Sequence, residues 1–144
     1  MTEVPRLDRQ VCFALYSASR AATAVYRPVL EELGLTYPQY LVMLVLWESE
    51  PRGVKELGEE LGLDSGTLSP LLKRLEVLGL VERRRSGEDE RRVAVHLTPA
   101  GRSLSRKAAA IPQRLADAAG LSAGELEQLR ETLGKLTAAL HGAL

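Results

Sequence analysis

Residues 54–78 read VKELGEELGLDSGTLSPLLKRLEVL, two short amphipathic segments on either side of a glycine. The first segment, 54–61, is followed by Gly62, and the second runs from Asp64 or Ser65 to about Leu78, before Gly79. Glycine commonly ends a helix, and aspartate or serine commonly begins one. Two short helices joined by a turn of three or four residues form a helix-turn-helix. The sequence therefore predicts this motif over 54–78.

A β-hairpin is predicted directly after the second of these helices. Residues 80–85 and 92–97 carry strand-like sequences, and the charged segment between them, residues 86–91, reads SGEDER. Two such segments around a polar turn indicate a hairpin. A helix-turn-helix followed at once by a hairpin is a winged helix. We therefore expect a mainly α fold with a small β wing, and a winged helix-turn-helix core over 36–98.

Further helices are predicted on both sides of this core. Apolar residues recur at three- and four-residue steps over 7–33, and Gly34 supplies a stop. The segment 36–39, TYPQ, can cap and begin a helix that ends before Pro51. Another helix begins at 98–99, with an interruption expected near Pro112. Residues 122–125 form a capping box for the last helix, whose leucines make a coiled-coil-like seam: Leu126, Leu129, Leu133, Leu136 and Leu140.

Length and charge fit a small nucleic-acid-binding protein. The 144 residues suit a single domain, 1–144, and the 19 basic and 19 acidic residues cancel. Their distribution is uneven, because 65–92 contain seven basic and five acidic residues whereas 1–64 contain six and ten. A local concentration of basic charge on a neutral chain is expected where nucleic acid binds.

Several classes of protein are disfavoured by the sequence. The single cysteine cannot form an intramolecular disulfide, and we find neither a secretion signal nor a membrane-spanning run, so we expect a cytoplasmic protein. His96 in a strand and His141 near the C-terminus are expected to be structural or surface residues. No metal-ligand spacing or glycine-rich phosphate loop is present. We expect no catalytic residues, no metal and no cofactor.

The second helix of the motif has an outward face suited to a DNA groove. Its leucines lie on one side, and short or basic side chains point away from them. A solvated helix surface would show the same pattern, but the hairpin that follows favours DNA. In that hairpin Asp89 can hold Arg91 by a bidentate hydrogen bond, which suits an arginine inserted into the minor groove. The predicted DNA-binding residues are Ser65, Thr67, Ser69, Pro70, Lys73, Arg74, Arg83, Arg84, Asp89 and Arg91.

Several motifs carry a resemblance to a known family. DERR at 89–92, LDSGTL at 63–68 and the long flanking helices resemble the multiple-antibiotic-resistance regulator (MarR) family of winged-helix repressors. Within it, VCFALYSASR at 11–20 and TYPQYL at 36–41 resemble the organic hydroperoxide resistance repressors (OhrR). The resemblance covers almost the whole chain. It implies a homodimer built from the helical regions 5–34 and 99–144, bound to a palindromic operator in double-stranded DNA and released by peroxide.

The same resemblance assigns a sensing site by position. Cys12 would be the redox-sensing thiol, with Tyr26 and Tyr37 as its hydrogen-bonding partners. Some members carry a second, resolving cysteine in the C-terminal helices, which this sequence lacks, so it resembles the one-cysteine type. The residues expected to give the thiol apolar surroundings suited to organic peroxides are Phe13, Leu15, Tyr16 and Met43.

Helix geometry predicts that this site is shared between two chains. Tyr26 lies fourteen residues from Cys12, which is about 21 Å along a helix. An antiparallel crossing of two copies centred near Ser19 would bring Tyr26 of one chain to Cys12 of the other. Phenol donors near the sulfur favour the thiolate, which a hydroperoxide oxidises to sulfenic acid. Without a resolving thiol, the sulfenate must react with a low-molecular-weight thiol, cyclise onto a backbone nitrogen or overoxidise.

Oxidation at such an interface predicts a switch, because two half-sites must stay about 34 Å apart and a shift of one wing domain would break that spacing. Three alternatives stay open at this point. The chain could be a regulator of the same fold that responds to a small aromatic ligand, with Cys12 structural. It could be a thiol peroxidase that uses Cys12, although no nearby conventional base supports this. It could also be a winged helix that binds proteins and never contacts DNA.

Overall fold

The structure of the protein, a computed structural model, describes residues 4–86 and 89–144, and the side chains of residues 86–91 lie outside that description. The chain divides into two compact units, residues 1–109 and 110–144, and we describe each by itself. The expectation of a single domain over 1–144 stays a prediction.

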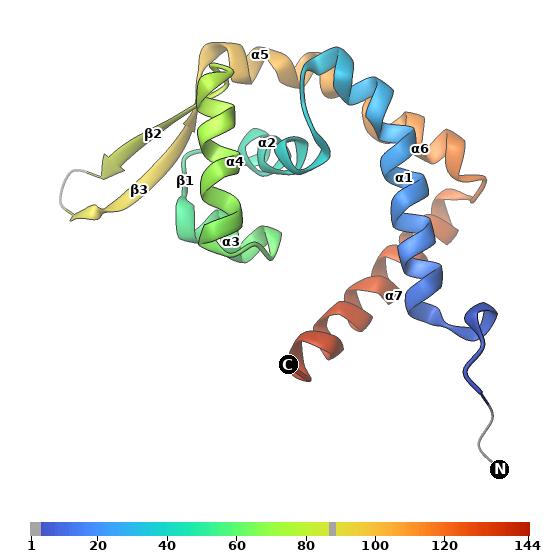
Figure 1. Cartoon of the computed structure of the whole chain (residues 1–144). Helices are drawn as coiled ribbons and strands as arrows, with labels where there is room; N and C mark the ends of the chain where they lie inside the picture. Colours follow the sequence, from blue (N-terminus) through green and yellow to red (C-terminus); the bar gives the residue numbers. More distant parts are fainter. Residues whose placement is uncertain (1–3, 87–88) are drawn as a thin grey trace. The chain divides into compact units, whose positions relative to one another are not determined.

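The first unit holds the helix-turn-helix and the wing (Figure 1). Its elements are η1 (Leu7–Arg9), α1 (Val11–Leu33), α2 (Tyr37–Glu48), β1 (Arg52–Gly53), α3 (Val54–Leu61), α4 (Ser65–Val77), β2 (Val81–Ser86), β3 (Asp89–Leu97) and α5 (Pro99–Ala108). The second unit consists of α6 (Ile111–Ala119) and α7 (Ala123–Gly142). The predicted mainly α fold with a small β wing is confirmed.

The N-terminal helix begins later than its periodicity predicts. Gln10 has an extended backbone, with φ −91° and ψ 118°, and separates η1 from α1. Its side-chain Nε2 donates a hydrogen bond to the backbone oxygen of Arg6 at 3.0 Å, so Gln10 closes η1 and does not continue into a longer helix. As a consequence, Cys12 lies in the first turn of α1.

The helix-turn-helix forms as predicted, with α3 and α4 as its two helices. Gly62 ends α3 in the left-handed conformation, with φ 68°. The turn passes so close to α3 that a Cβ at Gly58 would lie 2.8 Å from the backbone oxygen of Leu63. Asp64 caps α4 by accepting a hydrogen bond from Thr67 N at 2.8 Å, and this bond lowers the pKa of the Asp64 carboxyl. A close turn and a capped start together fix the direction of α4.

The core of the first unit is apolar, and the helices and the sheet that surround α2 contribute side chains to it. The Thr36 and Gln39 capping box begins α2, with bonds of 3.3 and 3.0 Å, and α2 then passes through the core. The most deeply buried large side chains of this unit are Val42, Met43, Leu46, Leu57, Leu68, Leu72, Leu75 and Val95. This packing of α2 against α3, α4 and β3 positions α4 and the wing.

The sheet has three strands in the order β1-β3-β2, all antiparallel. The sequence did not predict β1, a two-residue strand in which Arg52 lies opposite Val95. The charged turn was expected over 86–91, whereas β3 already begins at Asp89, paired with Ser86 beyond a register irregularity. Charged residues can continue a hairpin because ladder hydrogen bonds join backbone atoms.

The second unit matches the expected helical pattern. The helix after residue 99 is interrupted before Ile111, with Pro112 in the first turn of α6. Ser122 and Glu125 form the capping box of α7. Along its seam Leu126, Leu133 and Leu136 are partly buried, whereas Leu129 and Leu140 are more exposed, at 46% and 50%. In the described part of the chain, we find no helix with the length and apolar character that a membrane span requires.

One carboxylate joins the base of the wing to α5. Glu50 accepts a hydrogen bond from the backbone N of Leu97 at 3.1 Å and two from the Arg102 guanidinium at 3.0 Å each. The Arg102 hydrogen bond is the main cause that holds the pKa of Glu50 below its usual value of 4.5. The ionised form of Glu50 therefore stabilises the fold, and this contribution is lost as the pH falls through the lowered pKa.

We expect Glu50→Gln to lower the free energy of unfolding by about 1 kcal/mol near neutral pH, because a charge-assisted hydrogen-bond pair is removed. The difference from wild type should shrink at acidic pH, where Glu50 of the wild type is itself protonated. Urea unfolding followed by the fluorescence of Trp47, the single tryptophan, measures both. Glu48→Gln, at the exposed last residue of α2 and two positions before Glu50, is the matched control. An equal difference at every pH would contradict the assignment.

Candidate nucleic-acid interface and thiol site

The outward face of α4 is fully accessible in the first unit. Because its leucines point into the core, the polar and basic side chains of the helix are turned to solvent. The exposed residues on this helix that were predicted to bind DNA are Ser65, Thr67, Ser69, Pro70, Lys73 and Arg74. At 100° per residue they form two flanks, with Ser69 and Lys73 on the side of the wing and Arg74 on the side of α2. The structure thus exposes all six predicted residues on one helix, divided between two flanks.

The wing arginines are divided between two faces. Alternation along β2 places Arg83 on the same face as the buried Val81, and Arg84 on the opposite face. Arg83 donates through Nε to Glu76 of α4, and Arg84 donates through Nη2 to Glu82 at 3.1 Å. The two predicted DNA-binding arginines therefore do not share one surface, and each is paired with a carboxylate.

The predicted contact between Asp89 and Arg91 at the wing tip lies outside the described side chains. Nearer the base of the wing, the Arg84 hydrogen bond lowers the pKa of Glu82, and that of Arg84 is raised in turn. Both groups are consequently charged at neutral pH, so the outer face of the wing carries an ion pair.

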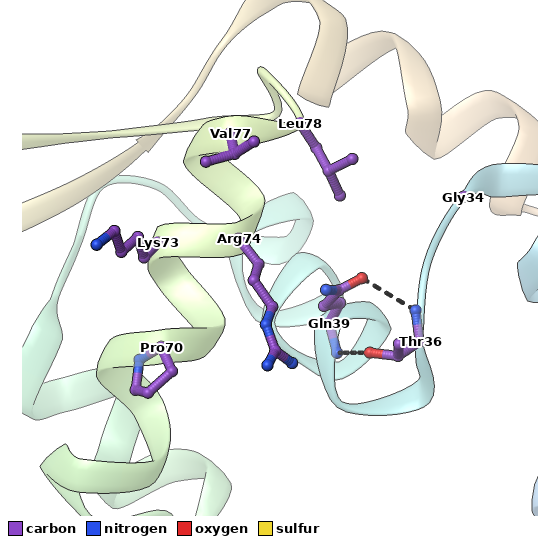
Figure 2. A pocket seen from close by; sticks show the side chains of 8 residues that line it. All are labelled: Gly34, Thr36, Gln39, Pro70, Lys73, Arg74, Val77 and Leu78. Atoms are coloured by element: carbon purple, nitrogen blue, oxygen red, sulfur yellow. Dashed lines mark hydrogen bonds between the residues drawn. The ribbon is translucent and has the colours of Figure 1, made fainter.

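A groove of about 530 Å³ lies between α4 and the turn that connects α1 to α2 (Figure 2). Arg74 extends into it toward Thr36 and Gln39, while Lys73 points away to the other side of α4. Val77 and Leu78 give the groove an apolar wall, and both are strongly exposed, at 81% and 49%. The groove therefore combines one guanidinium with apolar surface.

Cys12 is exposed on α1. It is the second residue of this helix, whose first turn has no side-chain cap, so backbone N–H groups without helical partners lie beside it. The thiol is therefore accessible to a molecule at the surface.

The residues expected around the thiol do not share one environment. Phe13 and Tyr16 are exposed on α1, at 41% and 59%, and the Arg20 guanidinium stacks on the Tyr16 ring at 5.4 Å. Leu15 is half-buried. Met43 is fully buried in the core of the first unit. Of the four, only those on α1 are in a position to meet a molecule at the surface.

The two predicted tyrosine partners are brought together. The rings of Tyr26 and Tyr37 lie 5.2 Å apart, and Tyr40 packs against them at 6.0 and 6.3 Å. Burial, and then the neighbouring Tyr37, raise the pKa of the Tyr26 phenol. Tyr26 is therefore a protonated hydrogen-bond donor at neutral pH, as a thiolate partner must be. Because α1 is continuous, Cys12 of the same chain is held about 21 Å away along the helix.

The sequence analysis missed two features, one in the tyrosine cluster and one on the surface of α4. Tyr40 packs edge-to-face against Trp47, whose Nε1 donates to the backbone oxygen of Gly101 at 2.8 Å, so the tyrosine cluster continues to α5. A tyrosine at the start of a buried helix gave no sign of this. Glu76 could have been noticed, because it is an acidic residue three positions after Lys73 on the otherwise basic face.

An accessible α4 preceded by α3 and followed by a β-hairpin defines a winged helix-turn-helix protein of the regulator class. Comparisons with known proteins agree with this class. The family model described as transcriptional regulator SarA/Rot matches residues 24–108. The organic hydroperoxide resistance transcriptional regulator of Bacillus subtilis (strain 168) is 48% identical over 136 residues, which cover 94% of this chain and 92% of that protein.

Solved structures resemble the chain over nearly its whole length. Reduced AbfR bound to DNA is 36% identical, with a TM-score of 0.77 and 94% of both chains covered. Overoxidised AbfR bound to DNA has the same identity and TM-score, with 94% of this chain and 95% of that chain covered. AbfR is a protein of Staphylococcus epidermidis. The chain belongs to the MarR-type family of winged helix-turn-helix transcription regulators. Because these relatives are regulators, the prediction that it is not an enzyme is confirmed.

We expect Lys73→Ala to weaken binding to DNA duplexes of any sequence, because an exposed lysine on this face is placed to neutralise a backbone phosphate. The slope of log affinity against log salt concentration should become shallower by about 0.9 for each phosphate that is no longer neutralised. Fluorescence anisotropy with a labelled random-sequence duplex measures this, and Lys107→Ala, an exposed lysine of α5, is the control. A protein-binding winged helix would give no steep salt dependence in either variant.

Proposed function

We propose that the chain is a homodimeric, cytoplasmic repressor that binds a palindromic operator and releases it when an organic hydroperoxide oxidises Cys12. One observation carries this proposal. The exposed thiol of Cys12 and the phenol of Tyr26 lie on the same continuous helix, α1, but too far apart to touch within one chain, and Tyr37 of α2 packs against Tyr26. A second chain is needed to complete the site.

The geometry of α1 supports a shared site. Cys12 and Tyr26 each lie seven residues from Ser19, on either side of it. Seven residues are close to two helical turns, so all three side chains point to nearly the same face. Two copies of α1 that cross antiparallel at Ser19 place each Cys12 beside the Tyr26 of the partner chain.

Exposed apolar side chains support dimerisation through the end helices. On α1, Val11, Phe13 and Val25 are 64%, 41% and 40% exposed. On α7, Leu129 and Leu140 are 46% and 50% exposed. Contiguous exposed apolar surface marks interaction sites, and a dimer interface along these helices would cover these side chains. We assign the regions 5–34 and 99–144 to the dimer interface.

The proposed chemistry requires one thiol. The Cys12 thiolate attacks the distal oxygen of a hydroperoxide, so an S–O bond forms and the O–O bond breaks. The sulfur is oxidised by two electrons, and the alkoxide that leaves takes a proton to become the alcohol. Tyr26 and Tyr37 of the partner chain stabilise the thiolate as neutral phenol donors. A low-molecular-weight thiol can then displace water from the sulfenic acid to give a mixed disulfide.

Relatives support this choice of signal. The Bacillus subtilis relative is named for organic hydroperoxide resistance. AbfR has been solved on DNA in a reduced and an overoxidised form, so this relative undergoes oxidation, although its overoxidised form is still bound to DNA. Oxidation adds bulk and polarity at an interface that spaces two α4 helices. A rigid shift there breaks the separation of about 34 Å that two half-sites require.

We expect the Cys12→Ser variant to bind DNA with the affinity of the wild type, and we expect oxidant to leave that affinity unchanged. An operator is first selected from a random duplex pool with reduced wild-type protein. Cumene hydroperoxide should then lower the operator affinity of the wild type by about tenfold or more, a typical size for coupling between two sites. The affinity of Cys12→Ser should be unchanged. A loss of affinity in both proteins would remove Cys12 from the sensing role.

The shared site has a test of its own in mixed dimers. One chain carries Cys12→Ser and the other carries Tyr26→Phe and Tyr37→Phe. A cross-chain site leaves one intact Cys12 beside intact tyrosines, so dimedone should label the oxidised Cys12 at the wild-type rate. The homodimer with both tyrosines replaced should react more slowly. Equally slow labelling in the mixed dimer would place the site within one chain.

One observation favours the alternative of a small aromatic ligand with Cys12 structural. The groove of Figure 2 offers Arg74 for an anionic group and an apolar wall at Val77 and Leu78. This alternative predicts that cumene hydroperoxide leaves operator binding intact, whereas an aromatic carboxylate such as salicylate weakens it. The Cys12→Ser comparison therefore also separates these two functions.

A further inference from the structure

The basic face of α4 contains one acidic residue, Glu76. At 100° per residue Glu76 falls on the flank toward the wing, together with Ser69 and Lys73. It accepts a hydrogen bond from Arg83 Nε, and both side chains are only 31% exposed. This ion pair connects α4 to β2 on the side of the first unit that is predicted to face DNA.

The pair engages only one edge of the guanidinium. Arg83 Nε is bound to Glu76, and within the described part of the chain we find no other partner for the terminal Nη1 and Nη2 atoms. A guanidinium has five N–H donors in a fixed plane, so fixing Nε orients the remaining four. Glu76 thus holds Arg83 in one orientation and leaves its outer edge able to donate.

The charges of the pair cancel on a surface that phosphates approach. Binding to arbitrary DNA depends on phosphate neutralisation by cations, whereas sequence is recognised through base edges. In its pair with Glu76, Arg83 contributes less to phosphate neutralisation on any duplex. Its fixed orientation favours contacts with base edges, which only an operator presents in a matching pattern.

We propose that Glu76 is a specificity-determining residue, which restrains Arg83 and weakens binding to arbitrary DNA more than binding to the operator. This inference rests on DNA binding through α4, and it is independent of the role proposed for Cys12. Glu76 acts as a positioning residue, since its effect passes through the Arg83 guanidinium.

Glu76→Gln tests the proposal because it removes the charge and keeps the shape. Affinity is measured for a random-sequence duplex and for the operator selected from a pool, each over a series of salt concentrations. We expect affinity for the random duplex to rise about threefold to tenfold, with a salt slope steeper by about 0.9 for each additional phosphate neutralised. Operator affinity should rise less, so that the ratio of the two affinities falls.

A matched variant separates this effect from a general loss of acidic charge. Glu127→Gln breaks a similar exposed pair, with Arg130 on α7, and neither residue is among those predicted to bind DNA. It should not change the affinity ratio as Glu76→Gln does. An equal change of the ratio in Glu127→Gln would overturn the proposal.

Arg83→Gln supplies a second test, which measures whether the effect of Glu76 on DNA affinity passes through Arg83. In the Arg83→Gln background, replacing Glu76 should give less than half of its effect in the wild type. A full effect in that background would show that Glu76 does not act through Arg83, and would overturn the proposal. If the wild type binds DNA and Glu76→Gln leaves the ratio of operator to random-duplex affinity unchanged, this inference alone is overturned. If the wild type binds neither duplex, the proposed function is overturned as well.

Discussion

Four leucines of α4, at positions 68, 71, 72 and 75, are exposed by no more than 8%, and they set the rotation of this helix about its axis. Burying each such side chain contributes about 2 kcal/mol, so a rotation that exposed them would cost more than any surface interaction could return. Once they face α2, α3 and the sheet, Ser69, Lys73 and Arg74 have no direction open except solvent. The Asp64 cap and the close turn at Gly58 then fix where the helix begins.

The continuity of α1 has the same importance for the thiol. A helix of 23 residues holds its ends at a fixed separation, so Cys12 in the first turn cannot approach Tyr26 of its own chain. A shorter or broken helix would allow an internal site and would remove the need for a partner. In the proposed function, redox sensing and dimer formation are therefore linked by the rigidity of one helix. The tyrosine cluster, which continues through Tyr40 and Trp47 to α5, anchors the other end of this helix to the core.

In the role inferred for Glu76, the wing lets a neutral protein bind a polyanion without binding every duplex tightly. Arg83 and Arg84 are each paired with a carboxylate on opposite faces of β2, while Lys73 and Arg74 on α4 are exposed. Paired arginines give up part of the attraction to phosphate and gain a defined orientation. Interactions that depend on orientation discriminate between sequences, whereas interactions that depend on charge alone do not.

The sequence by itself determined the helix-turn-helix, the capped ends of α2, α4 and α7, the hairpin and the outward face of α4. These follow from local rules, since caps, glycine stops and apolar periodicity act over three or four residues. It did not determine strand β1, the separation of Arg83 from Arg84, or the meeting of Tyr26 with Tyr37. Those depend on residues distant in the chain, and on which side of a strand a side chain faces once the strand is packed. Only the tertiary structure sets such arrangements, because the burial that selects them requires the whole core.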